Sequence, residues 1–349
     1  MLVAPLKNHT SRRNPRVTIR GVATAILRAT APWPATAAAA HPSAAGPSAA
    51  SPPAPPLGCR KLASLKLRDC GAPDGGRGFE ELASILAGSL RSLDLSCTRV
   101  GSRGLLQLAP LTGLTELLLD MCPVTDSGCQ VFSSLANLEH LDLSDTEVGN
   151  AGAFHISKLR RLSRLGLCDT DVGDGAVAAL TGLTRLTALN LDARHVSDEA
   201  LHLALPLAPH LKELDLYGCK VTLRGALALP AYRELTHLFL CGGWATDRSV
   251  LEVAKLPKLQ HLSLAQNPRL SDVSVRMLAG GACAATLEAL NLTGTAVGDG
   301  CLPLLAGMPA LAVVALSNTR VTRGAAESLR RTTKLVVKFS PPGATKGPE

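Results

Sequence analysis

The sequence predicts an α/β solenoid, in which short units of strand, turn and helix stack along one axis. Three observations carry this prediction. A leucine motif of the form LxxLxL recurs from Leu62 to the end of the chain, mostly at intervals of 24 residues. Each motif is followed by a similar run of small polar residues and a valine. Only 3% of the residues are aromatic, so small aliphatic side chains must build a core of thin layers.

The strand of each unit is predicted by alternation. The leucines at unit positions 4 and 6 are separated by polar residues, which is the period of a strand with one buried face. The stretches LRSLDLSCTRVGSRG from Leu90 and LEHLDLSDTEVGNAG from Leu138 show the whole unit. The first leucines of the units are Leu62, Leu90, Leu114, Leu138, Leu162, Leu186, Leu211, Leu235, Leu259, Leu287, Leu311 and Leu335.

The turn and the helix follow from the later unit positions. Position 9 is small and polar in most units, as in Thr146 and Cys219, and is expected to satisfy backbone groups where the chain leaves the strand. Position 11 is an apolar plug, usually valine. Position 13 is often of the helix N-cap type, as in Asp126 and Asp198, and apolar residues about three apart follow it.

Two units are four residues longer than the others, and their additional residues are Gly-rich. They lie around 72–78 and 280–285, and we expect both to bulge as loops at the edge of a unit.

Three segments are expected. Residues 1–57 are rich in Arg, Ala, Pro and Ser and are predicted to be a disordered tail, with a mitochondrial or plastid transit peptide as the alternative. Residues 58–340 form the solenoid of about 12 units. Residues 341–349 form a disordered C-terminal tail. One unit cannot bury its leucines alone, so the solenoid should behave as a single domain.

Charge and cysteine usage exclude several classes of function. Residues 1–61 hold eight of the 36 Lys and Arg residues and no Asp or Glu, so residues 62–349 carry 28 charges of each sign. Nucleic-acid binding is therefore expected only through the tail. The ten cysteines form no CxxC pair and are interpreted as buried free thiols of a reducing compartment. No phosphate loop, nucleophile elbow or HExxH motif occurs, and we expect neither a metal nor a cofactor.

The repeated unit resembles the leucine-rich-repeat superfamily over about four-fifths of the chain. Cys or Thr at position 9, followed by valine and an acidic residue, is most similar to the cysteine-containing class, in a shortened 24-residue variant. The resemblance implies a horseshoe with a concave parallel β-sheet and short convex helices, and members of the superfamily mostly bind proteins. The sequence is therefore interpreted as a non-catalytic scaffold, intracellular and most simply cytoplasmic, with a mitochondrion or plastid as the alternative.

Two candidate partner-binding surfaces follow from the strand positions expected to face solvent, which are positions 3, 5, 7 and 8. The first is a set of acidic columns suited to a basic protein partner. Its members are Asp94, Glu116, Asp120, Asp142, Asp145, Asp169, Asp192 and Asp215, with Glu213 in the same columns. The second is an aromatic end formed by Tyr217, Phe239 and Trp244. No small-molecule substrate is evident.

Two alternative functions remain. One is a substrate-recognition adaptor of a ubiquitin ligase complex, although the Pro/Ala-rich tail lacks the F-box that such family members carry. The other is a regulator of a GTPase or cyclase, for which Arg77 is the candidate residue. His237 and His261 stand at position 3 of consecutive units and should be neighbours, but a zinc site would need further ligands.

Overall fold

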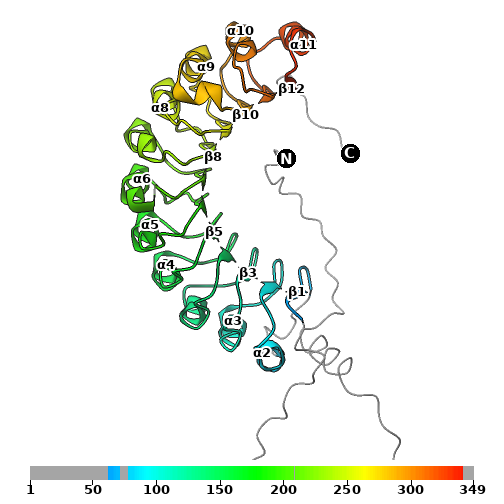
Figure 1. The fold of residues 1–349 in the computed structure, drawn as a ribbon, viewed down its shortest axis with the longest axis vertical. Helices are drawn as coiled ribbons and strands as arrows, with labels where there is room; N and C mark the ends of the chain where they lie inside the picture. The colour runs from blue at the N-terminus through cyan, green and yellow to red at the C-terminus, as the bar shows by residue number, and fades with distance from the viewer. Residues whose placement is uncertain (1–61, 71–77, 208, 341–349) are drawn as a thin grey trace, which may run out of the picture.

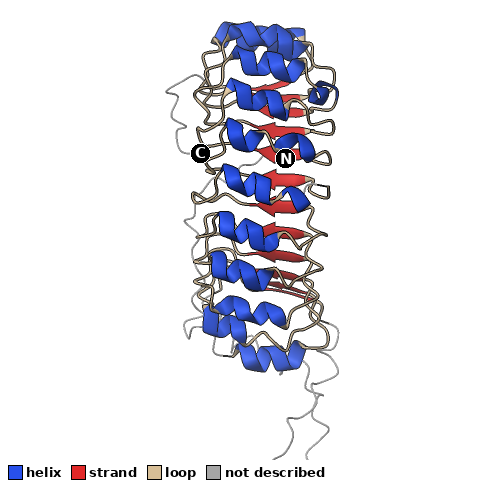
Figure 2. Cartoon of the chain, turned by 90° about the vertical axis from the view of Figure 1, so that its left-hand side faces the viewer, coloured by secondary structure: helices blue, strands red, loops and turns tan. Residues whose placement is uncertain are grey.

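The structure is a computed structural model, and it describes residues 62–70, 78–207 and 209–340. Both predicted tails lie outside these residues, and so do Arg77 and the remaining residues 72–76 of the first expected loop. The described chain forms a curved solenoid with the strands on its inner side (Figure 1), and a row of short helices covers the outer side (Figure 2). The horseshoe architecture expected from the repeat is confirmed.

One parallel sheet runs the length of the solenoid, and its twelve strands pair in sequence order. Neighbouring strands pair at equivalent unit positions, so that Leu93 lies beside Leu117 and Leu117 beside Leu141. The strands are β1 Ser64–Lys66, β2 Ser92–Asp94, β3 Glu116–Leu118, β4 His140–Asp142, β5 Arg164–Gly166, β6 Ala188–Asn190, β7 Glu213–Asp215, β8 His237–Phe239, β9 His261–Ser263, β10 Ala289–Asn291, β11 Val313–Ala315 and β12 Val336–Lys338.

Short helices return the chain from one strand to the next. The α-helices are α2 Phe79–Leu86, α3 Ser102–Leu106, α4 Asn150–Ile156, α5 Asp174–Leu180, α6 Asp198–Leu203, α7 Leu223–Ala226, α8 Asp247–Val253, α9 Asp272–Ala279, α10 Leu302–Ala306 and α11 Arg323–Thr332. The 3-10 helices are η2 Gly128–Ser133, η3 Leu205–Leu207, η4 Leu229–Ala231, η5 Ala282–Ala285 and η6 Asp299–Cys301.

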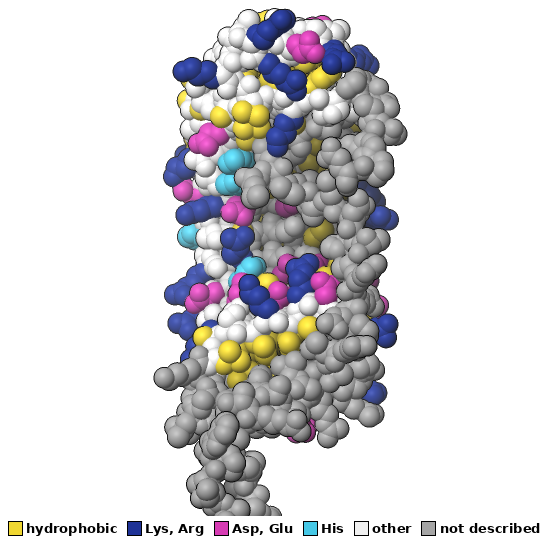
Figure 3. Space-filling view, turned by 90° about the vertical axis from the view of Figure 1, so that its right-hand side faces the viewer, with side chains coloured by type: hydrophobic (Ala, Val, Ile, Leu, Met, Phe, Trp, Pro, Cys, Tyr) yellow, Lys and Arg dark blue, Asp and Glu magenta, His cyan; other side chains and the backbone are white. Residues whose placement is uncertain are grey.

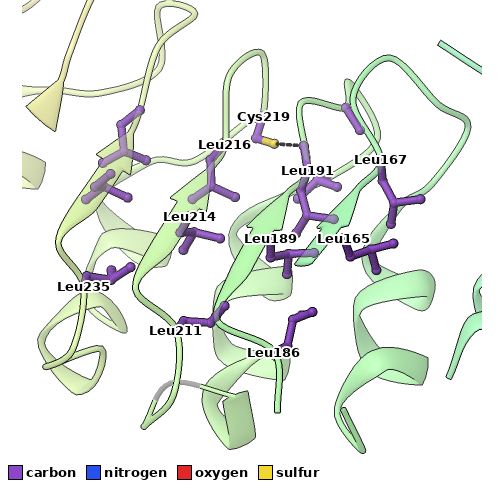
Figure 4. Packing of buried hydrophobic residues seen from close by; sticks show 14 of the residues in the cluster. Leu165, Leu167, Leu186, Leu189, Leu191, Leu211, Leu214, Leu216, Cys219 and Leu235 are labelled. Atoms are coloured by element: carbon purple, nitrogen blue, oxygen red, sulfur yellow. Dashed lines mark hydrogen bonds between the residues drawn. The ribbon is translucent and has the colours of Figure 1, made fainter. Parts of the chain in front are cut away.

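The core lies between the sheet and the helices and repeats with the sequence. Leucines at positions 1, 4 and 6 of neighbouring units pack against one another, as Figure 4 shows for Leu189 and Leu191 beside Leu214 and Leu216 of the next unit. The valine plug at position 11 is buried in each unit that has it; Val172, for example, exposes 0% of its surface. Each unit thus buries its leucines only because a neighbour covers them.

Position 9 satisfies backbone groups, as the sequence predicts. The Thr146 hydroxyl donates to the Leu143 carbonyl of its own unit at 2.6 Å. The Cys219 thiol instead donates to the Leu191 carbonyl of the preceding unit at 2.8 Å (Figure 4). The Asn267 amide group also reaches the preceding unit, where it donates to the Leu240 carbonyl at 2.7 Å. A cysteine here acts as a small buried donor.

Position 13 does not cap its own helix, so that expectation was wrong. Most of these residues are the first of the helix, Asp126 lies two residues before η2, and their side chains accept hydrogen bonds from the start of the helix region in the next unit. Asp126 Oδ1 accepts from the amides of Gly149 and Gly152, at 2.7 and 2.9 Å. Asp198 binds the amide and hydroxyl of Thr222, each at 2.6 Å. In a stack, the free amides of a helix N-terminus come within reach of the preceding unit.

The same ladder runs through most of the solenoid. Asn150, Asp174, Asp247, Asp272 and Asp299 each accept from the first amides of the next helix region. The close approach also explains why a glycine often stands two positions after position 13, where it meets the position-13 side chain of the preceding unit. A Cβ added to Gly152 would lie 2.7 Å from Asp126 Oδ1. Polar side chains between units therefore add to the apolar contacts that join them.

Two other expectations need correction. Residues 280–285 do not bulge as a loop, because η5 folds there and Cys283 is fully buried. The last strand is shifted by one residue from the motif counted from Leu335. Val336 pairs with position 3 of the preceding strand, so Val337 and Phe339 turn toward the core and Val336 is 57% exposed. A slip of one residue exchanges the two faces of a strand.

Candidate functional site

The concave face of the sheet carries the predicted acidic residues, but it is not a continuous acidic field. In the part of this face that described residues occupy, Lys and Arg side chains lie among the Asp and Glu side chains (Figure 3). Most of the predicted carboxylates are half-buried, Asp169 is exposed, and Asp94 is buried with only 8% of its surface exposed. The expectation that Asp94 faces solvent was therefore wrong.

The acids at position 5 support the backbone. The Asp94 carboxylate accepts a hydrogen bond from the Ser96 amide at 3.0 Å, and Asp142 accepts one from Ser144 at the same distance. Asp215 binds the Tyr217 amide at 2.9 Å. Asparagine takes the same role in Asn190 and Asn291. An Asp or Asn at this position accepts a hydrogen bond from the amide two residues later. That amide lies just after the end of the strand, where pairing with the neighbouring strand no longer provides an acceptor.

The acids at position 8 occupy a left-handed backbone conformation. Asp145 has a φ of 54° and Asp169 a φ of 52°. The equivalent residues of other units share this conformation, namely Asp69, Cys97, Met121, Gly218, Gly242, Gln266, Gly294 and Asn318. Asp, Asn and Gly are the residues that tolerate this region best. A structural requirement thus accounts for part of the acidic pattern.

The other acids of the columns have polar partners. The carboxylate of Glu116 accepts from the Ser92 hydroxyl at 2.6 Å and contacts His140 Nδ1 at 3.0 Å. The Ser92 hydrogen bond, followed by the contacts with His140, lowers the pKa of Glu116. Asp120 forms an ion pair with Arg68 at 3.6 Å. This arginine belongs to the first unit, which begins at Leu62.

Units five to seven carry the acidic residues nearest the middle of the sheet. Asp192 accepts a hydrogen bond from the Cys168 thiol at 3.1 Å. Arg164 Nη2 lies 3.9 Å from Glu213, which offsets part of the negative charge. Burial raises the pKa of Asp215 to about 6, and the charge of Asp192 adds to this increase. The middle of the concave face therefore holds several carboxylates close enough to influence one another.

The aromatic end is partly exposed. Tyr217 exposes 46% of its surface and Trp244 41%, whereas Phe239 is half-buried on β8 beside Asp215. The rings of His237 and His261 stack with centroids 4.3 Å apart, which confirms that these residues are neighbours. Burial, together with the charge of His261, lowers the pKa of His237. The aromatic residues and the histidine pair belong to units seven to nine.

Among the described residues, no group of three or more His, Cys, Asp or Glu side chains could hold a metal ion. The nine described cysteines are free, six of them are buried, and burial raises the pKa of Cys122 and Cys241 to about 11. No helix in the described part of the chain is long and apolar enough to cross a membrane.

Comparisons with known proteins agree with the repeat and the fold. A family model described as Leucine Rich repeat matches residues 89–109, 134–157 and 208–229. No curated protein sequence matches the chain.

Solved structures share the fold at low identity. A chain of the yeast Rad7 and Elc1 complex has a TM-score of 0.56 at 18% identity, covering 82% of this chain and 79% of that chain. A chain of the mouse RP105/MD-1 complex has a TM-score of 0.51 at 20% identity, with 82% and 47% covered. An internalin from Listeria monocytogenes is also similar, with a TM-score of 0.48, 20% identity, and 77% and 83% covered.

Proposed function

Because this chain is a leucine-rich-repeat protein, we propose that it is a non-catalytic scaffold that binds a partner protein on the concave face of its sheet. The observation that carries the proposal is the set of carboxylates that consecutive units present there, above all Asp142, Asp169, Asp192 and Asp215. Hydrogen bonds, or a left-handed backbone at Asp169, set the positions of these residues. A surface ordered before binding loses little entropy on association.

The partner that fits this surface is a protein with a basic patch. Several carboxylates lie on neighbouring strands about 4.8 Å apart, and their fields add within the concave space. Arg68 pairs with Asp120 and reduces the field over the first units, whereas Arg164 offsets only Glu213 in the middle, so the field should be strongest over units four to seven. The aromatic end lies next to this region and would contribute apolar contacts from Tyr217, Phe239 and Trp244.

A triple variant tests the proposal, namely Asp142→Asn, Asp169→Asn and Asp192→Asn together. Asparagine already occupies position 5 in Asn190 and position 8 in Asn318, so the fold should tolerate the first two changes. Affinity capture with the chain identifies partners, and surface plasmon resonance then compares the variants. We expect association to slow more than dissociation accelerates, because long-range charge acts mainly on encounter. Added salt should weaken the parent complex, since charges are screened beyond about 8 Å at physiological ionic strength.

The matched control removes three charges from other surfaces, with Glu81→Gln, Glu147→Gln and Asp171→Asn, all at exposed residues. It should bind as the parent does. Unchanged binding by the concave triple variant, with no dependence on salt, would contradict the acidic site. The site would then move to the aromatic end, where truncation of Tyr217, Phe239 and Trp244 should increase the dissociation rate.

An adaptor that joins two proteins is the second candidate function. Its support is the fold similarity to a chain of the yeast complex of Rad7 with Elc1. An adaptor would capture two partners on separate surfaces. The concave triple variant would then release one partner and keep the other, whereas a simple scaffold would lose its single partner.

A further inference from the structure

A shallow hollow of about 630 Å³ lies at the edge of the sheet where the chain enters its strands. Every lining residue stands within two positions of the first leucine of a unit, and the five units from Leu138 to Leu235 contribute. Hydrogen bonds between neighbouring units fix the backbone that lines the hollow. The amide and hydroxyl of Ser163 both donate to the Glu139 carbonyl, at 2.8 and 2.9 Å. The hollow is therefore a fixed part of the solenoid.

Three of its ten lining side chains are Lys or Arg. Arg161, Arg185 and Lys212 come from three consecutive units, and His210 lies among them. Arg161 Nη1 donates to Asn137 Oδ1 at 2.5 Å, which orients the guanidinium. Across the part of the chain that the structure describes, neither Arg185 nor Lys212 forms an ion pair. These two cations keep their donors available to a ligand.

Two carboxylates limit what can bind there. Glu234 lines the hollow but pairs with Lys258, whose Nζ lies 2.7 Å from it, and Glu139 is exposed at the other end. The lining holds three Lys or Arg side chains and two carboxylates, and Lys258, which pairs with Glu234 beside the hollow, brings the local excess to two positive charges. A phosphomonoester carries about −1.5 to −2 at neutral pH and accepts several strong hydrogen bonds from Arg and Lys. A longer polyanion lying along this edge would also contact Glu139 and Glu234, whose negative charges would repel it.

We propose that this hollow binds a phosphorylated serine or threonine side chain of a partner polypeptide. A hollow this open would leave a small free anion largely hydrated, whereas a chain lying on the sheet would hold its phosphate in place. The proposal rests on the proposed function, because the ligand belongs to a protein on the same units. From position 2 to position 7 a strand spans roughly 17 Å. The partner would thus carry its phosphate about five extended residues from its basic patch.

The test uses the whole chain and a fluorescein-labelled peptide, Gly-Ala-phosphoserine-Ala-Gly, which has no basic residues for the acidic columns to attract. Fluorescence anisotropy should show saturable binding, and the peptide with unmodified serine should not bind. The variant with Arg161→Gln, Arg185→Gln and Lys212→Gln should bind at least about tenfold more weakly. A control with Arg248→Gln, Arg269→Gln and Arg276→Gln removes three exposed charges elsewhere and should bind within about twofold of the parent.

Several results would overturn the proposal. They are no saturable binding up to about 1 mM protein, equal binding of the unmodified peptide, an equal loss in both triple variants, or tighter binding of a ten-residue oligothymidylate than of the phosphopeptide. Equal thermal unfolding of the two triple variants shows that the loss does not come from misfolding. The acidic-column variant should bind this peptide normally, so a failure of the concave site and a failure of the hollow give different results.

Discussion

Asp215 has a carboxylate at a strand position where this chain uses asparagine elsewhere. Burial, with a contribution from Asp192, raises its pKa to about 6. A carboxyl with a raised pKa adds stability below its unfolded pKa of about 4, and this stability is lost as pH rises through about 6. Asp215→Asn should therefore increase the free energy of unfolding at pH 7.5 by about 1–2 kcal/mol, and change it little at pH 4.

Urea unfolding followed by circular dichroism at the two pH values measures this difference. Asparagine can keep the hydrogen bond to the Tyr217 amide, as Asn190 and Asn291 do to their own amides. The control is Asp142→Asn, the same change at the same unit position, which we expect to alter stability by less than about 0.5 kcal/mol. A gain at Asp215 that was equal at both pH values would show that burial of its charge is not the cause.

At this scale the sequence predicts which strand residues leave the core but not what holds them. Alternation of apolar and polar residues directs Asp142 and Asp215 toward the concave face. Their hydrogen bonds to the amide two residues later depend on backbone angles that alternation does not specify. The left-handed backbone at position 8 could have been predicted, because Gly218, Gly242 and Gly294 occupy this position in other units and glycine favours a positive φ.

The helices are joined to one another by acids that cap the next unit. Asp198 accepts from both the amide and the hydroxyl of Thr222, which precedes α7. Asp198→Ala should lower the free energy of unfolding by about 1–2 kcal/mol, as the loss of a strong N-cap does. Because neighbouring units stabilise one another, the loss should also appear as faster amide hydrogen exchange in the helices on both sides.

Asp171→Ala is the control, since the exposed Asp171 side chain forms no hydrogen bond or ion pair with any described residue. Chemical denaturation should leave this variant within about 0.5 kcal/mol of the parent. If exchange increased only in α6, the cap would act within its own unit and the ladder between units would be wrong.

Position 13 shows why the helix starts were predictable from the sequence, whereas the hydrogen bonds of the position-13 side chains were not. An Asp or Asn before an apolar run is the usual sign of an N-cap, and the sign correctly located the helix starts. Which helix the side chain caps depends on the distance between stacked units, and a motif within one unit does not contain that distance. The same limit applies to η5, where Gly281 approaches Ala254 of the preceding unit.

The whole molecule follows from the period of the sequence, apart from its last unit. Strands in consecutive units pair at equivalent positions, so counting leucines predicts the register as far as β11. In the last unit a leucine count misplaces the strand, whereas the alternation of Val337, Lys338 and Phe339 gives the observed register. Arg330 of α11 binds the Val337 carbonyl through two nitrogens, at 3.0 and 2.6 Å, and holds this strand at the end of the sheet.

The last strand should act as the cap of the solenoid. Deleting residues 334–349 removes β12 and leaves the strand edge of β11 open, with Val314 and Leu316 no longer covered by Val337 and Phe339. An open edge beside newly exposed apolar surface favours association between chains. We expect a lower melting temperature and aggregation that increases with protein concentration, measured by calorimetry and light scattering. Deleting only 341–349 keeps β12 and should leave both unchanged. A soluble, equally stable 334–349 deletion would show that β11 already ends the fold.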